Sequence, residues 1–239
     1  MADSIRFETF EGASVLLRRT NRKKSISLSI RDGDIVILAP KRVPDREIHD
    51  LMVKRTEWIR SKLANQATLP QITERKFVDD DIFLFLGEEY PLRVMDGPRA
   101  KAELEEGVFV VHARRAHTQE RRARSIRAAF LRWYKEEAEA LFTNRTGHYA
   151  DQMGAAPGRI LFRDYKSMWG KCTGQGEITY NWKLVMAPPQ IVDYVIVHEL
   201  AHLHHLNHSR KFWDCVERVI PDHKVRRKWL KDHGQTLTI

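Results

Sequence analysis

The chain has 239 residues, of which 42% are hydrophobic and 31% charged, a balance typical of a globular protein with a buried core. No apolar run reaches the ~20 residues needed to cross a bilayer, and two cysteines are too few for a disulfide framework. These features exclude membrane-spanning and disulfide-rich secreted proteins. Because the first residues also lack the plan of a signal peptide, we expect a cytoplasmic protein with no membrane partner.

The formal net charge is +9, and basic residues cluster at positions 18–24, 121–124 and 226–228. A positive surface raises the local concentration of polyanions, so a weak association with nucleic acid is one interpretation. The clusters lack the interleaved aromatic residues on which single-stranded bases stack. We favour the simpler interpretation that the basic surface only keeps the protein soluble.

The first half of the chain is expected to be rich in β-strands. Residues 25–30 alternate serine with apolar residues, and Asp32-Gly33 is a turn signal before a second strand at residues 35–38. Asp45 is then placed to cap one helix. The apolar residues of that helix recur at helical spacing: Ile48, Leu51, Met52, Trp58, Ile59 and Leu63.

A polar segment and further strands follow this helix. Residues 64–76 are interpreted as a linker or exposed loop, and pairs of short strands are predicted at residues 82–95 and 101–112. The composition then becomes strongly basic, and helical periodicity begins within the basic segment. We therefore predict an α+β fold in two parts. Residues 1–113 form a β-rich N-terminal subdomain of antiparallel hairpins plus a helix, and residues 114–239 form a second domain.

The second domain is expected to begin with a long helix, whose apolar residues recur at helical spacing over residues 126–141. A separate short helical or irregular piece is expected over residues 147–154. Strands are predicted from residue 160 and over residues 177–182. Pro189 then opens an apolar helix, because proline is tolerated in a first helical turn.

This apolar helix carries an H-E-x-x-H motif, His198-Glu199-Leu200-Ala201-His202. Positions four apart lie on one face of a helix, so the two imidazoles can converge on one Zn²⁺. Glu199 would lie beside the ion, where it could take a proton from bound water. The apolar run of residues 191–197 indicates burial, which would be costly for these side chains without a metal partner. The motif therefore predicts a zinc-dependent hydrolase with one zinc ion per chain.

A catalytic zinc site usually has three protein ligands and an open position for water. His208 is our first choice for the third ligand, provided that the chain bends near Asn207, since asparagine tolerates the conformation that ends helices. Three alternatives stay open at this point. They are His204 and His205 on the same helix, and Glu217 from a later helix.

Short motifs on both sides of the H-E-x-x-H segment form a set: Arg163, Met168–Cys172, Ile178–Leu184, Ala187–Pro189, Tyr194–Val195, His198–Leu203, Asn207–Ser209 and Phe212–Trp213. This set resembles the YgjP-like metal-dependent hydrolases, which are similar to the SprT and WLM zinc metalloproteases. The likeness implies a zincin-like α+β metallopeptidase core, with His198, His202 and His208 as metal ligands. One position departs from the family pattern, because Lys171 stands where the family usually has serine in the Trp169–Cys172 loop.

Hydrolysis of an amide bond suits these residues. Zinc can polarise a carbonyl and activate water, and Glu199 can accept the proton and pass it to a leaving amine. A peptide or protein is therefore the expected substrate, held along residues 177–182 if that strand lies at a sheet edge. Arg163, Tyr180 and Asn181 are candidates for contacting the substrate or the transition-state oxyanion, by proximity in the sequence alone.

Two other functions remain as alternatives. A metal-dependent hydrolase of a small anionic substrate, such as a nucleoside triphosphate, would have basic residues near the site and prefer Mg²⁺ or Mn²⁺, whereas three histidines suit zinc better. A nucleic-acid-binding module with structural zinc would need a fourth protein ligand and would have no need of the glutamate. The sequence does not indicate an oligomeric state.

Overall fold

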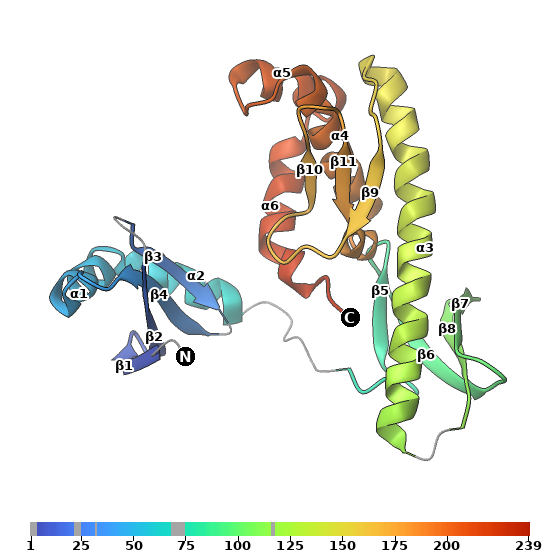
Figure 1. Ribbon diagram of the computed structural model, residues 1–239, viewed down its shortest axis with the longest axis horizontal. Coiled ribbons are helices and arrows are strands. Elements are labelled where there is room, and N and C mark those ends of the chain that lie inside the picture. The colour runs from blue at the N-terminus through green and yellow to red at the C-terminus, as the bar shows by residue number, and fades with distance from the viewer. Residues whose placement is uncertain (1–3, 22–24, 32, 68–74, 116–117) are drawn as a thin grey trace. The chain divides into compact units, whose positions relative to one another are not determined.

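The computed structural model of the chain describes residues 4–21, 25–31, 33–67, 75–115 and 118–239 (Figure 1). The predicted α+β class is confirmed, with N-terminal strands preceding a mainly helical core. The chain divides into two compact units, residues 1–71 and residues 72–239. Parts of the predicted polar linker and of the first basic cluster lie outside the described residues. No helix of the described ranges is both long and apolar enough to cross a membrane.

The N-terminal unit contains a four-stranded sheet in the order β1-β2-β4-β3. The predicted hairpin of β3 and β4 is antiparallel, and so is the hairpin of β1 and β2, whereas the central pair β2 and β4 is parallel. The two hairpins are thus joined side by side through one parallel pairing. The strands are β1 (Ser4–Phe10), β2 (Ala13–Thr20), β3 (Ser27–Arg31) and β4 (Asp34–Pro40).

The single helix predicted after these strands is instead two helices, α1 (Asp45–Lys54) and α2 (Thr56–Ala67). The break is at Arg55, whose φ of −113° and ψ of 14° depart from helical geometry. Asp45 is the first helical residue rather than the cap, and its carboxylate pairs with Arg19. Apolar residues of the helices close a core with alternate strand residues: Ile48, Met52 and Ile59 with Val15, Leu17, Ile35 and Ile37.

The second sheet repeats the arrangement of the first, with the order β5-β6-β8-β7, antiparallel hairpins and a parallel central pair. Both of its hairpins turn through two residues with positive φ, Leu86-Gly87 and Glu106-Gly107, as a type I′ turn requires. The repeat lies in the order of the strands and their turns, not in a repeated sequence. The strands are β5 (Ile82–Phe85), β6 (Glu88–Asp96), β7 (Lys101–Glu105) and β8 (Val108–Ala113).

This second sheet belongs to the same unit as the H-E-x-x-H helix, so the division of the chain differs from the predicted boundary at residue 113. The sheet packs directly on α3 (Gln119–Met153), where the Phe83 ring stacks on Phe130 with 4.3 Å between the ring centroids. One hydrophobic core therefore runs from the sheet through α3 into the rest of the unit. The basic segment marks the start of a helix inside this unit, not a boundary between units.

α3 is one continuous helix of 35 residues. The Thr118 side chain accepts a hydrogen bond from the Arg121 N–H at its start, and Gly154 ends it in the left-handed conformation with φ 61°. The helix continues through Gly147, where a separate piece was predicted, because its buried face continues beyond that glycine. Buried residues recur every four positions along it: Ile126, Phe130, Tyr134, Ala138, Phe142, Thr146 and Ala150.

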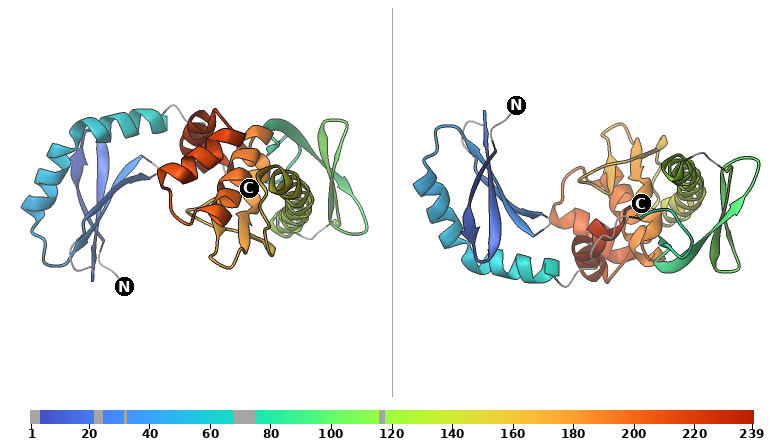
Figure 2. Two further views of the ribbon diagram at one scale, coloured as in Figure 1. Left: turned by 90° about the horizontal axis from the view of Figure 1, so that it is seen from above. Right: turned by 90° about the horizontal axis from the view of Figure 1, so that it is seen from below.

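The H-E-x-x-H helix α4 (Pro189–His204) lies at the centre of the second unit, and its residues 191–197 are all buried, as predicted. Figure 2 shows α3 seen end-on beside it. A three-stranded sheet in the order β10-β11-β9 also packs on α4 through β10. The surrounding elements are β9 (Ile160–Arg163), β10 (Gly170–Cys172), β11 (Ile178–Asn181), the 3-10 helix η1 (Trp182–Met186), α5 (Arg210–Val219), α6 (His223–His233) and the 3-10 helix η2 (Gly234–Thr236).

The order of this sheet corrects one prediction about substrate binding. The strand at residues 177–182 was proposed to hold a peptide if it lay at a sheet edge, but β11 is the central strand and pairs on both sides. The short strand β10, whose pairing partner is β11, lies at the edge instead. The edge nearest α4 is therefore formed by the Trp169–Cys172 loop region.

Candidate metal centre

Three histidine side chains come together at the C-terminal end of α4. His198 and His202 stand one turn apart on the helix, and His208 comes from the segment that joins α4 to α5. The Nε2 atoms of His198 and His208 are 3.1 Å apart, and one ring nitrogen of each histidine lies within 4.8 Å of the other two. Two nitrogens that bind one tetrahedral zinc at ~2.0–2.1 Å lie roughly 3.3 Å apart, so this spacing fits a single ion.

The end of α4 orients His202 toward this group. The helix ends at His204, earlier than the predicted bend near Asn207, and His205 is extended with φ −142° and ψ 105°. The His202 Nδ1 lies 3.1 Å from the His205 carbonyl oxygen. A proton on Nδ1 donated to this oxygen leaves Nε2 of His202 with its lone pair, the arrangement typical of a metal-binding imidazole.

The other candidates for a third ligand do not belong to the group of three. His205 contributes its backbone carbonyl rather than its ring, and His204 and Glu217 are exposed elsewhere on α4 and α5. Within the described ranges, no fourth histidine, cysteine or carboxylate joins the group. Its donor set is therefore three imidazoles, which matches a catalytic zinc site more closely than a closed structural one.

Helix α5 supports the three rings from one side. Phe212 is fully buried, and its ring centroid lies 4.6–4.9 Å from those of His198, His202 and His208. The Trp213 ring stacks on His208 at 5.7 Å with 26° between the planes. The packing of Phe212 and Trp213 against the histidines limits the positions that the imidazoles can adopt.

Burial shifts the proton affinity of the groups at this site. Burial lowers the pKa of His198 to about 3, with smaller contributions from the neighbouring imidazoles. Burial also lowers the pKa of His202 and raises the pKa of Glu199 to about 8. Neutral imidazoles keep the lone pair that a metal ion needs. The Nδ1 atom of His198 is buried and has no hydrogen-bond partner in the described part of the chain.

Glu199 lies against the backbone of β10. A Cβ atom added to Gly170 would lie 2.4 Å from Glu199 Oε1, far closer than side chains approach in real structures. Because side chains alternate along a strand, Lys171 faces the other side, where it is exposed. The departure from the family pattern at Lys171 thus leaves the face toward Glu199 unchanged, while Gly170 allows the carboxylate to reach the strand.

The outer edge of β10 has free hydrogen-bonding groups. The Asn181 N–H donates to the Trp169 carbonyl at 2.8 Å, so Trp169 belongs to the set that bonds to β11. Residues alternate between the two edges of an antiparallel strand, so the N–H and C=O groups of Gly170 and Cys172 point away from β11. No backbone partner for these groups is found within the described residues.

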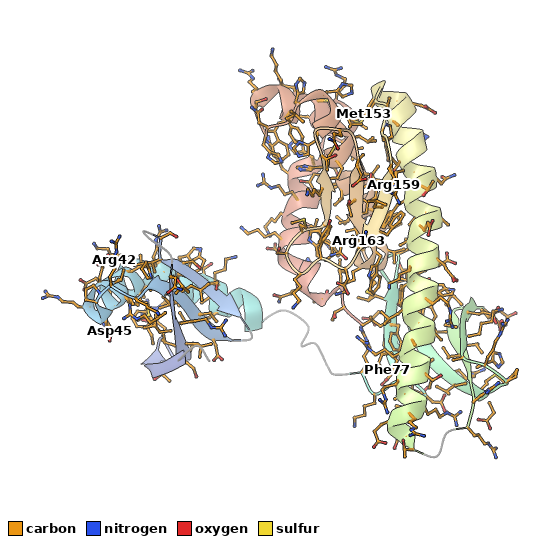
Figure 3. All side chains as sticks on the ribbon, viewed as in Figure 1. Arg42, Asp45, Phe77, Met153, Arg159 and Arg163 are labelled. Atoms are coloured by element: carbon orange, nitrogen blue, oxygen red, sulfur yellow. The ribbon has the colours of Figure 1, made fainter. Side chains whose placement is uncertain are left out.

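Arg163, Tyr180 and Asn181, the predicted substrate contacts, have other neighbours. Tyr180 is fully buried, burial raises the pKa of its phenol, and its hydroxyl lies 3.1 Å from Thr146 Oγ1. The Asn181 side chain donates to two carbonyls of the loop before β10, at 2.9 and 3.1 Å. Arg163 is exposed at the end of β9 (Figure 3). Among the residues described, none of the three forms a hydrogen bond with Glu199 or the histidines.

One residue near the site was missed from the sequence. The guanidinium carbon of Arg227, on α6, lies 5.2 Å from the centroid of the Trp213 ring. Burial raises the pKa of Tyr194, and the charge of Arg227 acts in the opposite direction. In the sequence Arg227 is only the middle of a basic run. Nothing local marks it, because its neighbours lie on α4 and α5.

The family model of the YgjP-like metallopeptidase domain matches residues 24–233. The chain belongs to the YgjP-like family. The resemblance seen in the sequence motifs is thereby confirmed, and membership of a metallopeptidase family supports a metal-dependent hydrolase. No curated protein matches this YgjP-like chain.

Two solved structures resemble part of the YgjP-like chain, both of them metallopeptidase zymogens. Abylysin of Pyrococcus abyssi is 28% identical, and the match covers 38% of this chain and 93% of abylysin with a TM-score of 0.35. Jannalysin of Methanocaldococcus jannaschii is 18% identical, and the match covers 41% of this chain and 97% of jannalysin, also with a TM-score of 0.35.

Proposed function

We propose that this protein is a zinc-dependent peptidase in which His198, His202 and His208 bind one Zn²⁺ and Glu199 acts as general base. One observation carries the proposal: three histidine nitrogens lie within 4.8 Å of one another, beside a buried carboxylate that lies against a free strand edge. Three neutral imidazoles with no fourth ligand in the described chain leave a coordination position for water. Membership of a metallopeptidase family supports the same assignment.

When bound, the zinc ion would polarise the scissile carbonyl and lower the pKa of water. Glu199 would accept the proton of the attacking water and pass it to the nitrogen of the leaving amine. Glu199 is only 5% exposed, and it forms no ion pair with a described residue. Its carboxylate is therefore available to accept this proton. Gly170 keeps the carboxylate beside the strand edge, where the substrate backbone would lie.

An extended peptide is the substrate that this edge can hold. The outward N–H and C=O groups of Gly170 and Cys172 can form main-chain hydrogen bonds with a peptide added to β10 as a further strand. Such a strand would run next to Glu199, since Gly170 touches that carboxylate. We therefore propose that the enzyme acts on extended peptides or on unfolded segments of proteins.

The state of the two cysteines indicates the redox environment of the protein. Cys172 and Cys215 are free thiols. Disulfides persist in oxidising compartments and are rare in reducing ones, so two free cysteines fit a reducing environment. We propose a cytoplasmic location on this ground.

The test is cleavage of casein-like proteins and extended peptides by the zinc-loaded protein, compared with Glu199→Gln. We expect Glu199→Gln to keep its zinc and to lose about 10²- to 10⁴-fold in kcat, because it loses the general base. Glu217→Gln, at an exposed glutamate outside the histidine group, is the matched control and keeps both zinc and turnover. Undiminished cleavage by Glu199→Gln would remove this residue as the base. A wild-type protein that hydrolyses only nucleoside triphosphates would overturn the peptidase assignment.

A further inference from the structure

Arg227 is a cation that lies over the indole ring of Trp213, which contacts two of the three histidines. Its guanidinium carbon lies 5.2 Å from the Trp213 ring centroid. The same ring lies 5.7 Å from His208 and 5.8 Å from His198, measured between centroids. A side chain that starts on α6 thus brings a permanent positive charge to the ring that contacts two of the proposed zinc ligands.

The charge of Arg227 is not neutralised by the chain itself. Its neighbour Arg226 pairs with Asp222 at 2.9 Å, and Lys228 pairs with Asp232 at 2.6 Å. Arg227 is exposed and forms no ion pair within the part of the chain that the structure describes. Of these three consecutive basic residues, the one that lies over Trp213 is therefore the one whose charge is available to a ligand.

The Trp213 ring that lies under Arg227 is itself held in place by stacking. Trp213 stacks on His208 and also on His223, whose ring lies 5.3 Å away at 18° and which is only 3% exposed. A guanidinium that lies over an aromatic ring keeps the N–H groups at its edge free for hydrogen bonds. The Arg227 fork is thus partly ordered before a ligand arrives, which lowers the entropic cost of binding.

We propose that Arg227 binds a carboxylate of the substrate beside the metal centre, so that the enzyme favours peptides with an acidic group near the scissile bond. The planar fork of an arginine matches the two oxygens of a carboxylate in a bidentate pair. The proposal rests on the peptidase function and adds a specificity to it. The carboxylate could belong to an acidic side chain or to the C-terminus of the peptide, and the test separates these sources.

The experiment uses one extended peptide sequence in four forms, with Glu or Gln beside the scissile bond and with a free or amidated C-terminus. We expect Arg227→Met to lower kcat/KM about 10- to 100-fold for the carboxylate-bearing form that the enzyme prefers, mainly through KM. Arg227→Lys restores part of the loss. Lys228→Met removes one charge from the solvent-facing side of the same helix and is expected to match the wild type.

Binding provides a second readout that does not depend on turnover. The same four peptides, fluorescently labelled, are titrated into Glu199→Gln protein with and without Arg227→Met, and the Kd is measured by anisotropy. A loss confined to the Glu forms identifies a side-chain carboxylate, and a loss confined to the free C-terminus identifies the terminal one. Arg227-dependent binding without any cleavage by the wild type would support this proposal and overturn the peptidase function. An equal loss of affinity for all four peptides would overturn the proposal. Arg227-dependent binding of triphosphates but not of peptides would overturn it as well.

Discussion

Glu199 and Gly170 share a space that has no room for another side-chain atom. A Cβ atom at Gly170 would lie 2.4 Å from Glu199 Oε1 and 2.7 Å from Cδ, so the carboxylate would have to move. The position of a general base matters because proton transfer requires hydrogen-bond reach to the attacking water. The role proposed for Glu199 therefore depends on a glycine at this position of β10.

We predict that Gly170→Ala lowers kcat about 10²-fold, the loss that a displacement of the order of 1 Å can cause, while zinc content stays unchanged. Zinc is retained because the three histidines lie on other elements. Gly174→Ala is the matched control in the same loop region, since nothing lies within 4 Å of its added Cβ. Peptide turnover and zinc content per chain are measured for both variants. Wild-type turnover in Gly170→Ala would show that the carboxylate is not needed in its present place.

The junction between the second sheet and α4 depends on a hairpin turn. The N–H groups of Leu86 and Gly87 donate to the carbonyls of Val185 and Met186 at 2.9 and 3.0 Å. A Cβ at Gly87 would lie 2.9 Å from the Cα atom of Pro188, at the start of the H-E-x-x-H helix. This turn thus ties the second sheet to the element that carries two of the three histidines.

Gly87→Ala is predicted to destabilise the protein more than Gly107→Ala. The two glycines have similar φ, +87° and +82°, so each substitution costs about 1–2 kcal/mol from the left-handed backbone conformation. The contact with Pro188 adds about 1–3 kcal/mol at Gly87 alone, whereas the space around Gly107 is open. The free energy of unfolding from urea titrations measures the difference. Equal losses for the two variants would mean that the turn does not pack on α4 in this way.

Helices and strands with strong local patterns could be predicted from the sequence. The residues at which helices end, and the strands that pair with one another, could not. Periodicity located the hairpin of β3 and β4, the long helix α3 and the apolar helix α4. It did not reveal the break at Arg55 or the continuation through Gly147, because packing on neighbouring elements decides both. The parallel pairing of β2 with β4 joins strands from separate hairpins, and the alternation within each strand carries no information about that partner.

For the chain as a whole, the two units have separate hydrophobic cores. Among the described residues, the cluster around Ile37 and the cluster around Ile196 share no member. Ile37 and Ile196 are both fully buried, so replacing each by alanine removes the same side chain from the core of each unit. Only the second cluster includes residues of α4, the helix that carries two of the three proposed metal ligands.

We predict that Ile37→Ala and Ile196→Ala each cost about 2–5 kcal/mol of unfolding free energy in their own unit, but only Ile196→Ala weakens zinc retention. Loss of packing under α4 lets its histidines separate at a lower denaturant concentration. A colorimetric chelator that reports released zinc during a urea titration measures this directly. Release at the same lowered urea concentration in both variants would contradict separate cores.

The candidate site was predictable where its residues are close in sequence. The spacing of His198 and His202 marks a helix face, and His208 follows after a short bend. The unit boundary and Arg227 were not predictable, because they depend on which distant elements pack together. The basic composition after residue 113 suggested a unit boundary at a place where a helix begins inside one unit. Arg227 lies over Trp213 because α6 packs on α4.

Zinc content of His208→Ala, measured by elemental analysis beside wild type and His205→Ala, tests the central claim most directly. We predict about one zinc per chain in the wild type, a loss in His208→Ala, and retention in His205→Ala, since His205 contributes its backbone carbonyl and not its ring. X-ray absorption of the wild-type protein should show three imidazole nitrogens at about 2.0–2.1 Å. Stoichiometric zinc in His208→Ala would contradict the three-histidine centre.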